Sequence, residues 1–165
     1  MLDSLMPLKP APGHSTHPQL KGPQNHCFAC GKDNPQGMHL EFTIDEQARQ
    51  AICHFTLDRH FTGPPGHAHG GIIATILDEA MGKMNKLRKV VALTREMRIV
   101  YLKPVPLDKP LTVTSREHKV EGREHTNVAE ITDDQGRVLA RSTGVFVAID
   151  PARVASMLSK RQVEQ

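Results

Sequence analysis

The chain has 165 residues, with 21 basic and 18 acidic side chains and a net charge of +3. This length suits one domain with a core of its own, and the hydrophobic share of 38% argues against intrinsic disorder. Basic residues alternate with acidic ones, and the chain has no Trp and one Tyr. We therefore expect neither a strongly basic nucleic-acid surface nor a set of base-stacking aromatic residues.

The N-terminal 25 residues contain five prolines and few periodic apolar positions, which predicts a flexible arm. No basic segment followed by an apolar stretch is present, so no secretory signal is expected. No apolar run approaches the ~20 residues of a membrane helix. Three cysteines without such a signal fit a reducing compartment. We expect a cytoplasmic protein with an arm (1–25), a domain (26–150) and a C-terminal helix or tail (151–165).

Apolar residues alternate with polar ones over 38–44 and again over 51–57, which predicts a strand hairpin. Three- and four-residue apolar spacing from Ile72 to Leu87 predicts the one long helix. Four further strands are expected, around 91–102, 111–120, 124–132 and 137–149. Pro151 would open a short terminal helix over Pro151–Val163.

The expected order of elements does not alternate strands with helices. It predicts an α+β fold, with an antiparallel sheet of about six strands wrapped on one long central helix. One helix cannot cover such a sheet completely, which favours dimerisation.

The predicted helix carries a candidate catalytic carboxylate. On a helical wheel, Asp78 falls away from the isoleucine stripe, next to the small residues Gly71, Ala74, Thr75 and Gly82. A carboxylate in a groove of small side chains suits a ligand or a closely packed backbone. From the helical wheel alone, this interpretation and that of an ordinary surface or interface Asp are equally well supported.

His69-Gly70-Gly71 opens the same helix, where the first backbone N–H groups have no intrahelical acceptor. Such donors suit a developing oxyanion. Gly70 lies eight residues from Asp78, or about 12 Å along a helix. One reacting carbonyl therefore cannot reach both groups of one helix. If both serve one reaction, they come from two antiparallel helices of a symmetric dimer.

The segment Gly66–Ala80, GHAHGGIIATILDEA, resembles the signature of PaaI-like hotdog-fold thioesterases. In that family His-Gly-Gly opens the long helix, and an acidic residue follows nine positions after the His. The segments CFACG at Cys27–Gly31 and YLKPVP at Tyr101–Pro106 are further similarities. The resemblance covers about residues 26–149 and implies the hotdog fold.

The resemblance also implies hydrolysis of an acyl-CoA thioester without a metal or organic cofactor. Asp78 would be the nucleophile or the general base, and the Gly70 N–H would polarise the carbonyl. His69 would support that end of the helix, and Thr94 would orient the attacking water. Many relatives carry Asn six residues before the His, where this chain has Gly63, so the group that positions the water is left open.

Gly71, Lys103 and Arg123 are candidates for substrate binding. Lys103, Arg123 and Arg141 are candidate partners for CoA phosphates, and the alternative for each is an ordinary solvated charge at a strand end. The expected partners are acyl-CoA and further copies of the chain, as a homodimer or a dimer of dimers. Neither nucleic acid nor a membrane is expected. The alternative function is a non-catalytic acyl-CoA or acyl-carrier binding protein on the same fold.

Cys27-x-x-Cys30 is a possible zinc or redox pair, but zinc usually takes four ligands and no second such pair follows. His26 and His39 could complete a set, although His39 falls on a predicted strand. We therefore expect no metal site. Cys53, beside apolar residues of the second strand, is expected to be a small core residue.

Overall fold

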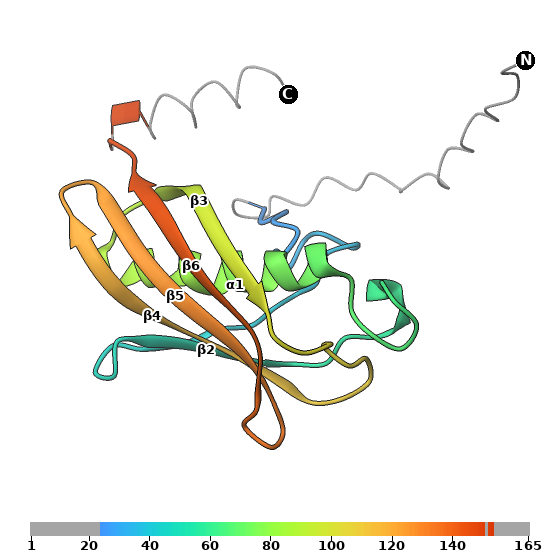
Figure 1. Ribbon diagram of the computed structural model, residues 1–165. Helices are drawn as coiled ribbons and strands as arrows, with labels where there is room; N and C mark the ends of the chain where they lie inside the picture. Colours follow the sequence, from blue (N-terminus) through green and yellow to red (C-terminus); the bar gives the residue numbers. More distant parts are fainter. Residues whose placement is uncertain (1–23, 151, 154–165) are drawn as a thin grey trace, which may run out of the picture.

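A computed structural model describes residues 24–150 and 152–153, in which a long helix lies within the curve of an antiparallel sheet (Figure 1). Helix α1 spans Gly70–Met84, between the short 3-10 helices η1 (Arg59–Phe61) and η2 (Asn85–Arg88). The strands are β1 (Thr43–Asp45), β2 (Gln50–Phe55), β3 (Ala92–Tyr101), β4 (Leu111–Glu121), β5 (Glu124–Asp133) and β6 (Val138–Ala148). Their order in the six-stranded sheet is β1-β2-β4-β5-β6-β3. The predicted α+β architecture is confirmed.

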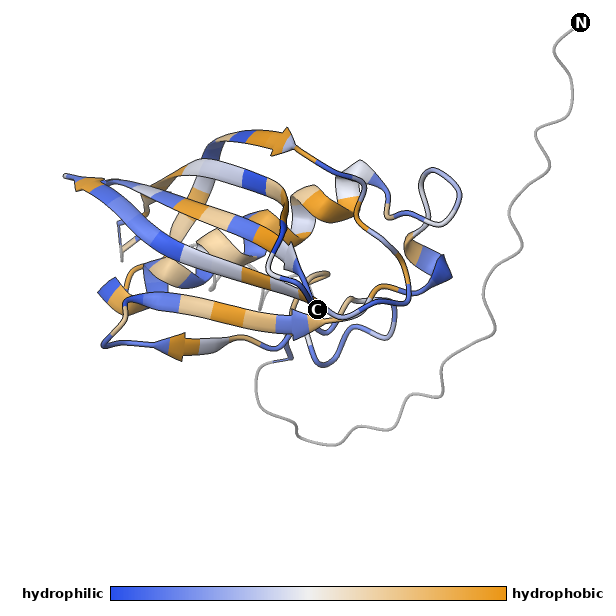
Figure 2. Ribbon diagram, turned by 60° about the horizontal axis from the view of Figure 1, so that its bottom comes forward, coloured by the Kyte–Doolittle hydropathy of each residue, from blue (hydrophilic) through white to orange (hydrophobic). Residues whose placement is uncertain are grey.

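Helix α1 is fixed to the sheet by an apolar stripe and by buried hydrogen bonds. Figure 2 shows apolar residues alternating with polar ones along the strands around the helix. Near the C-terminal end of α1, the buried Ser115 hydroxyl donates to the Ala80 carbonyl at 2.6 Å, and the buried Asn127 amide donates to that of Met81 at 2.9 Å. These bonds satisfy carbonyl groups at a helix end that water does not reach. The buried apolar residues of α1 are Ile73, Ile76, Leu77, Ala80, Met81 and Met84.

The first predicted strand is wrong over most of its length. Only Thr43–Asp45 pairs with β2, whereas residues 38–42 run beside the preceding loop, with the Leu40 N–H donating to the Ala29 carbonyl at 2.9 Å. His39 has a φ of 52°, in the left-handed region that interrupts a regular strand. Leu40 is nevertheless buried in the core. The alternation of apolar and polar residues over 38–42 therefore reflects burial rather than strand pairing.

Both predicted terminal segments lie mainly outside the described residues. This applies to the arm at 1–25, of which residues 24 and 25 are described, and to the helix expected at Pro151–Val163. Across the described ranges, no helix has both the length and the apolar character needed to span a bilayer.

β3 forms a long edge of the sheet. It pairs with β6, and no other described strand lies against its second edge. Large apolar side chains are exposed along it and beside it: Val91, Leu93, Tyr101 and Leu102, with Leu93 59% exposed. A long edge strand with exposed apolar residues is a surface that proteins usually cover.

Glu117 on β4 joins three separate parts of the fold. Its carboxylate accepts hydrogen bonds from Arg88 at the end of η2, at 2.6 and 2.8 Å, and from Arg49 in the β1–β2 turn, at 2.9 Å. The hydrogen bonds from Arg88 and then from Arg49 outweigh the effect of burial and lower the pKa of Glu117 from 4.5 to about 2.

We expect Glu117→Gln to lower the free energy of unfolding by about 1 kcal/mol at neutral pH. Because the pKa of Glu117 is depressed in the folded state, its charge stabilises the fold above pH 4.5, and this contribution is lost as the pH falls towards about 2. Urea unfolding of parent and variant across this range tests the prediction. The two proteins should converge in acid, and a difference that stays constant with pH would contradict the assignment.

Candidate active site

The carboxylate predicted as the nucleophile or the general base lies against β3. The Thr94 hydroxyl donates a hydrogen bond to Asp78 Oδ1 at 2.8 Å, joining residues that are 16 positions apart. Asp78 is half-buried on α1. Because the hydroxyl holds Oδ1, the second carboxylate oxygen, Oδ2, is the one left to act on a substrate or a water molecule. The structure thus brings together two of the predicted site residues.

A β-bulge directs Thr94 towards α1. The register between β3 and β6 shifts between Thr94 and Glu96, so Arg95 is an extra residue in the strand. Ala92 packs against the core before the bulge, and Met97 packs against it after the bulge. Even-numbered residues therefore face the helix up to Thr94, and odd-numbered residues face it from Met97 onwards. The bulge lets Thr94 share the inward face with both.

His69 caps the start of α1. Its Nδ1 accepts the Gly71 N–H at 2.9 Å, so the proton of the neutral ring is on Nε2. The Gly70 N–H, in contrast, meets no acceptor among residues 24–150 and 152–153. The two predicted glycine donors thus differ: Gly71 completes the cap, and Gly70 is available to an oxyanion at the positive end of the helix dipole.

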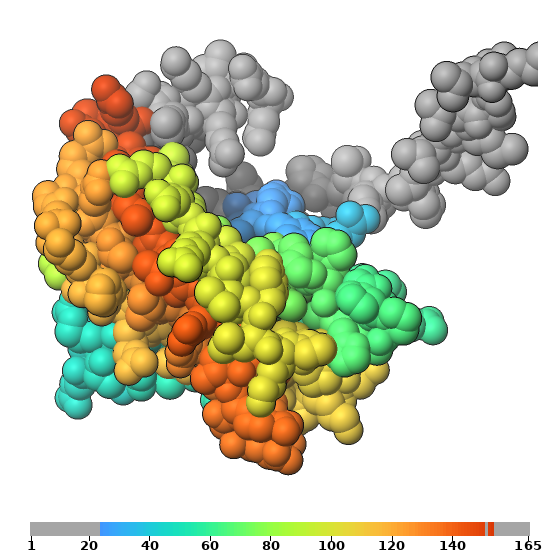
Figure 3. Space-filling view, in the orientation of Figure 1, coloured from blue at the N-terminus to red at the C-terminus, as the bar shows by residue number. Residues whose placement is uncertain are grey.

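A hollow of about 350 Å³ opens beside Gly70. Tyr101 at the end of β3 donates its hydroxyl to the Gly70 carbonyl at 3.1 Å. Figure 3 shows the loop after β3, in yellow, against the start of α1, in green. Lys103 lies in that loop and lines the hollow, whereas Asp78 lies outside it. Tyr101 was not among the predicted site residues, and its position at the end of a strand was the available signal. Apolar residues also line the hollow: Pro64, Ile73, Leu102, Pro104 and Val105.

The remaining predicted residues are far apart within one chain. Gly70 and Asp78 share the uninterrupted helix α1, about 12 Å apart along its axis. The Lys103 N–H donates to the Leu139 carbonyl, and the Arg123 side chain donates to that of Ala148 at 3.0 Å. These acceptors are nine residues apart on β6, or about 30 Å. Lys103 and Arg123, two of the cations proposed for CoA phosphates, therefore lie at opposite ends of the sheet.

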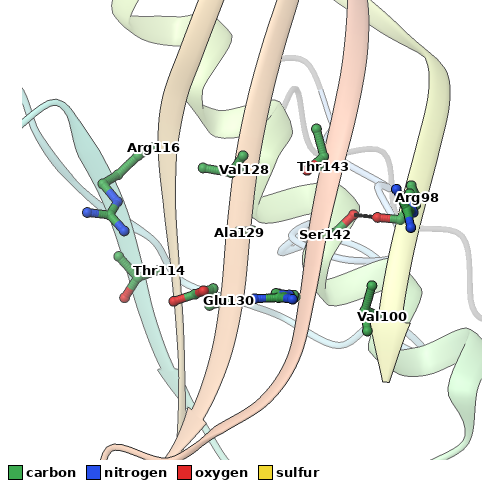
Figure 4. Close-up of a pocket in the computed structure, with 10 residues that line it drawn as sticks. Arg98, Val100, Thr114, Arg116, Val128, Ala129, Glu130, Ser142 and Thr143 are labelled. Atoms are coloured by element: carbon green, nitrogen blue, oxygen red, sulfur yellow. Dashed lines mark hydrogen bonds between the residues drawn. The ribbon is translucent and has the colours of Figure 1, made fainter. Parts of the chain in front are cut away.

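Another hollow, of about 430 Å³, lies on the outer face of the sheet (Figure 4). Arg98, Arg116 and Arg141 line it together with Glu130. In this view α1 lies behind the strands. The sheet therefore separates this hollow from Asp78 and Gly70, and it is not part of the candidate active site.

Gly63, the position at which the resemblance leads us to expect Asn, contacts the start of α1. A Cβ on Gly63 would lie 2.6 Å from His69 Cα. The Gly63 N–H donates to the His67 carbonyl at 2.9 Å, and the His69 N–H donates to that of Phe61 at 2.8 Å. The loop backbone therefore occupies the space that a side chain at position 63 would need.

We expect Gly63→Ala to lower the free energy of unfolding by about 1–3 kcal/mol, because the added methyl group must displace His69 or the loop. Gly82→Ala is the matched control, since a Cβ there meets Phe146 at 3.9 Å, an ordinary contact, and alanine favours a helix. Urea unfolding of both variants tests the prediction. Equal stability of the two alanine variants would show that the loop gives way freely.

Comparison with known proteins identifies the family. Residues 65–140 match the family described as Thioesterase superfamily. Acyl-coenzyme A thioesterase THEM4 of Rattus norvegicus is 31% identical over 119 residues, which are 70% of this chain and 51% of that protein. The crystal structure of RHA08564, a thioesterase superfamily protein, is 30% identical with a TM-score of 0.71, covering 74% of this chain and 60% of that chain. Residues 65–140 of the chain belong to the thioesterase superfamily.

The PaaI protein of E. coli is similar in fold, with a TM-score of 0.63 at 19% identity over 68% of this chain and 81% of that chain. The hotdog fold expected for this chain is confirmed. The chain spans about half the length of the curated relatives it matches.

Proposed function

We propose that this protein hydrolyses an acyl-CoA thioester to a free acid and CoA. The observation that carries the proposal is the 2.8 Å hydrogen bond from Thr94 to Asp78, beside the open edge of β3. The Gly70 N–H, which meets no acceptor in the described part of the chain, supplies the donor that a thioester oxyanion needs. Similarity to acyl-coenzyme A thioesterases of the THEM4 and THEM5 type, over about half their length, supports the same reaction class.

In the proposed reaction Asp78 supplies the negative charge. Its Oδ2 either attacks the thioester carbon or removes a proton from the water that attacks. Thr94 orients the carboxylate through Oδ1. The carbonyl oxygen gains charge as the carbon becomes tetrahedral, and the Gly70 N–H stabilises it. Collapse of the intermediate breaks the C–S bond and releases CoA as its thiolate. If Asp78 acts as the general base, it returns its proton to this thiolate and the acid is free at once. If Asp78 acts as the nucleophile, a water molecule then hydrolyses the acyl anhydride on Asp78, which frees the acid and supplies the proton for the thiolate.

The site is completed by a second copy of the chain. Because Asp78 and Gly70 are about 12 Å apart on one helix, the Asp78 of one protomer acts on a carbonyl held at the Gly70 of its partner. An antiparallel pairing at the β3 edge would bring the two helices together and cover Val91, Leu93 and Tyr101. Two such dimers can assemble further into a tetramer.

Asp78→Asn should reduce kcat for the best substrate by about 10²–10⁴-fold, because it removes the charge but keeps the shape. Thr94→Val should cause a smaller loss, since Asp78 remains but is no longer oriented. Release of free thiol from short, long and aromatic acyl-CoAs provides the measurement, with circular dichroism as the control for folding. A folded Asp78→Asn variant with parental kcat would remove Asp78 from the mechanism. A parent that hydrolyses none of them would favour the binding protein.

Mixing two inactive variants tests the shared site. Gly70→Val should block the approach to the Gly70 N–H without altering Asp78. In a mixed dimer with Asp78→Asn, one site carries both changes and the other carries neither, so random exchange of subunits should restore about a quarter of the parental activity. Light scattering confirms the dimer before and after mixing. Mixed dimers without any recovered activity would place both groups in one protomer.

A further inference from the structure

Two thiols and a carboxylate meet outside the candidate active site. Cys27 and Cys30 lie in the loop before residue 38, and Glu79 lies on α1, 52 positions beyond Cys27. One sulfur from each cysteine and one oxygen of Glu79 all lie within 4.8 Å of one another. The Cys27 Sγ is 3.8 Å from Glu79 Oε2. Both cysteines are free thiols, and Cys27 is exposed to solvent.

The loop that carries the two thiols is tightly built. The Gly31 N–H donates to the Cys27 carbonyl at 2.8 Å, which closes a turn around Cys30. A Cβ on Gly31 would lie 2.5 Å from the carbonyl oxygens of both Asn25 and Cys27. Only glycine fits this turn without moving the backbone, and the turn holds both sulfurs on the side that faces Glu79. The ligand atoms are therefore gathered before any ion arrives.

Lys83 balances the charge of this cluster. Its ammonium group donates to the Cys30 Sγ at 3.0 Å and forms an ion pair with Glu79. The Lys83 residue is 8% exposed, and its ammonium group lies 5.4 Å from the centre of the Phe42 ring. Two thiolates and one carboxylate carry three negative charges, which a divalent cation and the Lys83 ammonium would neutralise. The N–H···S bond to Cys30 is also the kind of outer contact that orients a metal ligand.

The sequence alone predicts no metal site because it shows no further ligands beside Cys27 and Cys30, but the fold brings Glu79 to them. We propose that Cys27, Cys30 and Glu79 bind one zinc ion, which joins the loop before residue 38 to α1. Zinc fits because it prefers thiolate sulfur and accepts a carboxylate in a tetrahedral set, with water in the fourth position at the exposed side of Cys27. The two thiols lose one proton each as two Zn–S bonds form, and no electron is transferred. The ion stabilises the fold, and Asp78 chemistry does not depend on it.

Titration of the reduced, metal-free full chain with Co²⁺ tests the proposal. One Co²⁺ should bind per chain, with an intense near-ultraviolet thiolate-to-metal band and the visible bands of tetrahedral coordination. About two protons should be released per ion, because thiols must ionise to bind. Zn²⁺ should displace Co²⁺ and raise the Tm of the parent. A parent that binds no stoichiometric Co²⁺, or binds it without the thiolate band, would overturn the proposal.

Matched variants assign the ligands. Cys27→Ser changes an exposed side chain and should fold as the parent does, yet weaken Co²⁺ binding at least about tenfold and abolish the rise in Tm with Zn²⁺. Glu79→Gln should weaken binding while keeping the thiolate band, with circular dichroism to confirm folding. Cys53→Ala alters a thiol buried in the core and should bind as the parent does. Parental binding by Cys27→Ser, or loss of binding in Cys53→Ala, would refute the assignment. None of these readouts depends on hydrolysis.

Discussion

The geometry of the candidate active site depends on one extra residue in β3. Without the bulge at Arg95, the strand alternation that directs Met97 to the core would turn Thr94 to the outer face of the sheet. Asp78 would then lack its hydroxyl donor, because α1 is fixed to the sheet and cannot rotate to follow it. The bulged Arg95 itself forms an ion pair with Glu124 of β5. The irregular pairing of β3 with β6 is therefore anchored by the ion pair of Arg95, while the neighbouring Thr94 is directed towards α1.

Because α1 is held rigidly, adjacent residues on this helix contact different parts of the structure. Successive residues of a helix diverge by about 100°, so Asp78 and Glu79 point to different places although they are adjacent in the chain. Asp78 meets β3, whereas Glu79 meets Cys27 and Lys83 beside the loop before residue 38. One helix, held by its apolar stripe, thus positions two separate groups of polar residues. A change in the packing of that stripe would disturb both groups together.

The sequence predicts those parts of the structure that produce a local periodic pattern of apolar residues. The long helix and five of the six strands follow from apolar spacing, because burial on one face imposes that spacing. Asp78 stood out on the helical wheel for the same reason. Periodicity predicts burial at residues 38–42 but not the element, since Leu40 is buried without belonging to a strand. The bulge at Arg95 and the pairing of Cys27 with Glu79 have no local signal, because each depends on register or on contacts between distant segments.

The placement of the reactive groups also links assembly to chemistry. Among the described residues of one protomer, the hollow beside Gly70 has a candidate oxyanion donor but no carboxylate, and Asp78 accepts the Thr94 hydroxyl about 12 Å along the helix from that donor. The long open edge of β3 lies next to both incomplete halves, because Tyr101 contacts Gly70 and Thr94 contacts Asp78. Pairing two copies at this edge would bury its apolar side chains and complete two sites in one step. The proposed dimer therefore follows from the separation of Gly70 and Asp78 along α1, which prevents a single chain from forming the whole site.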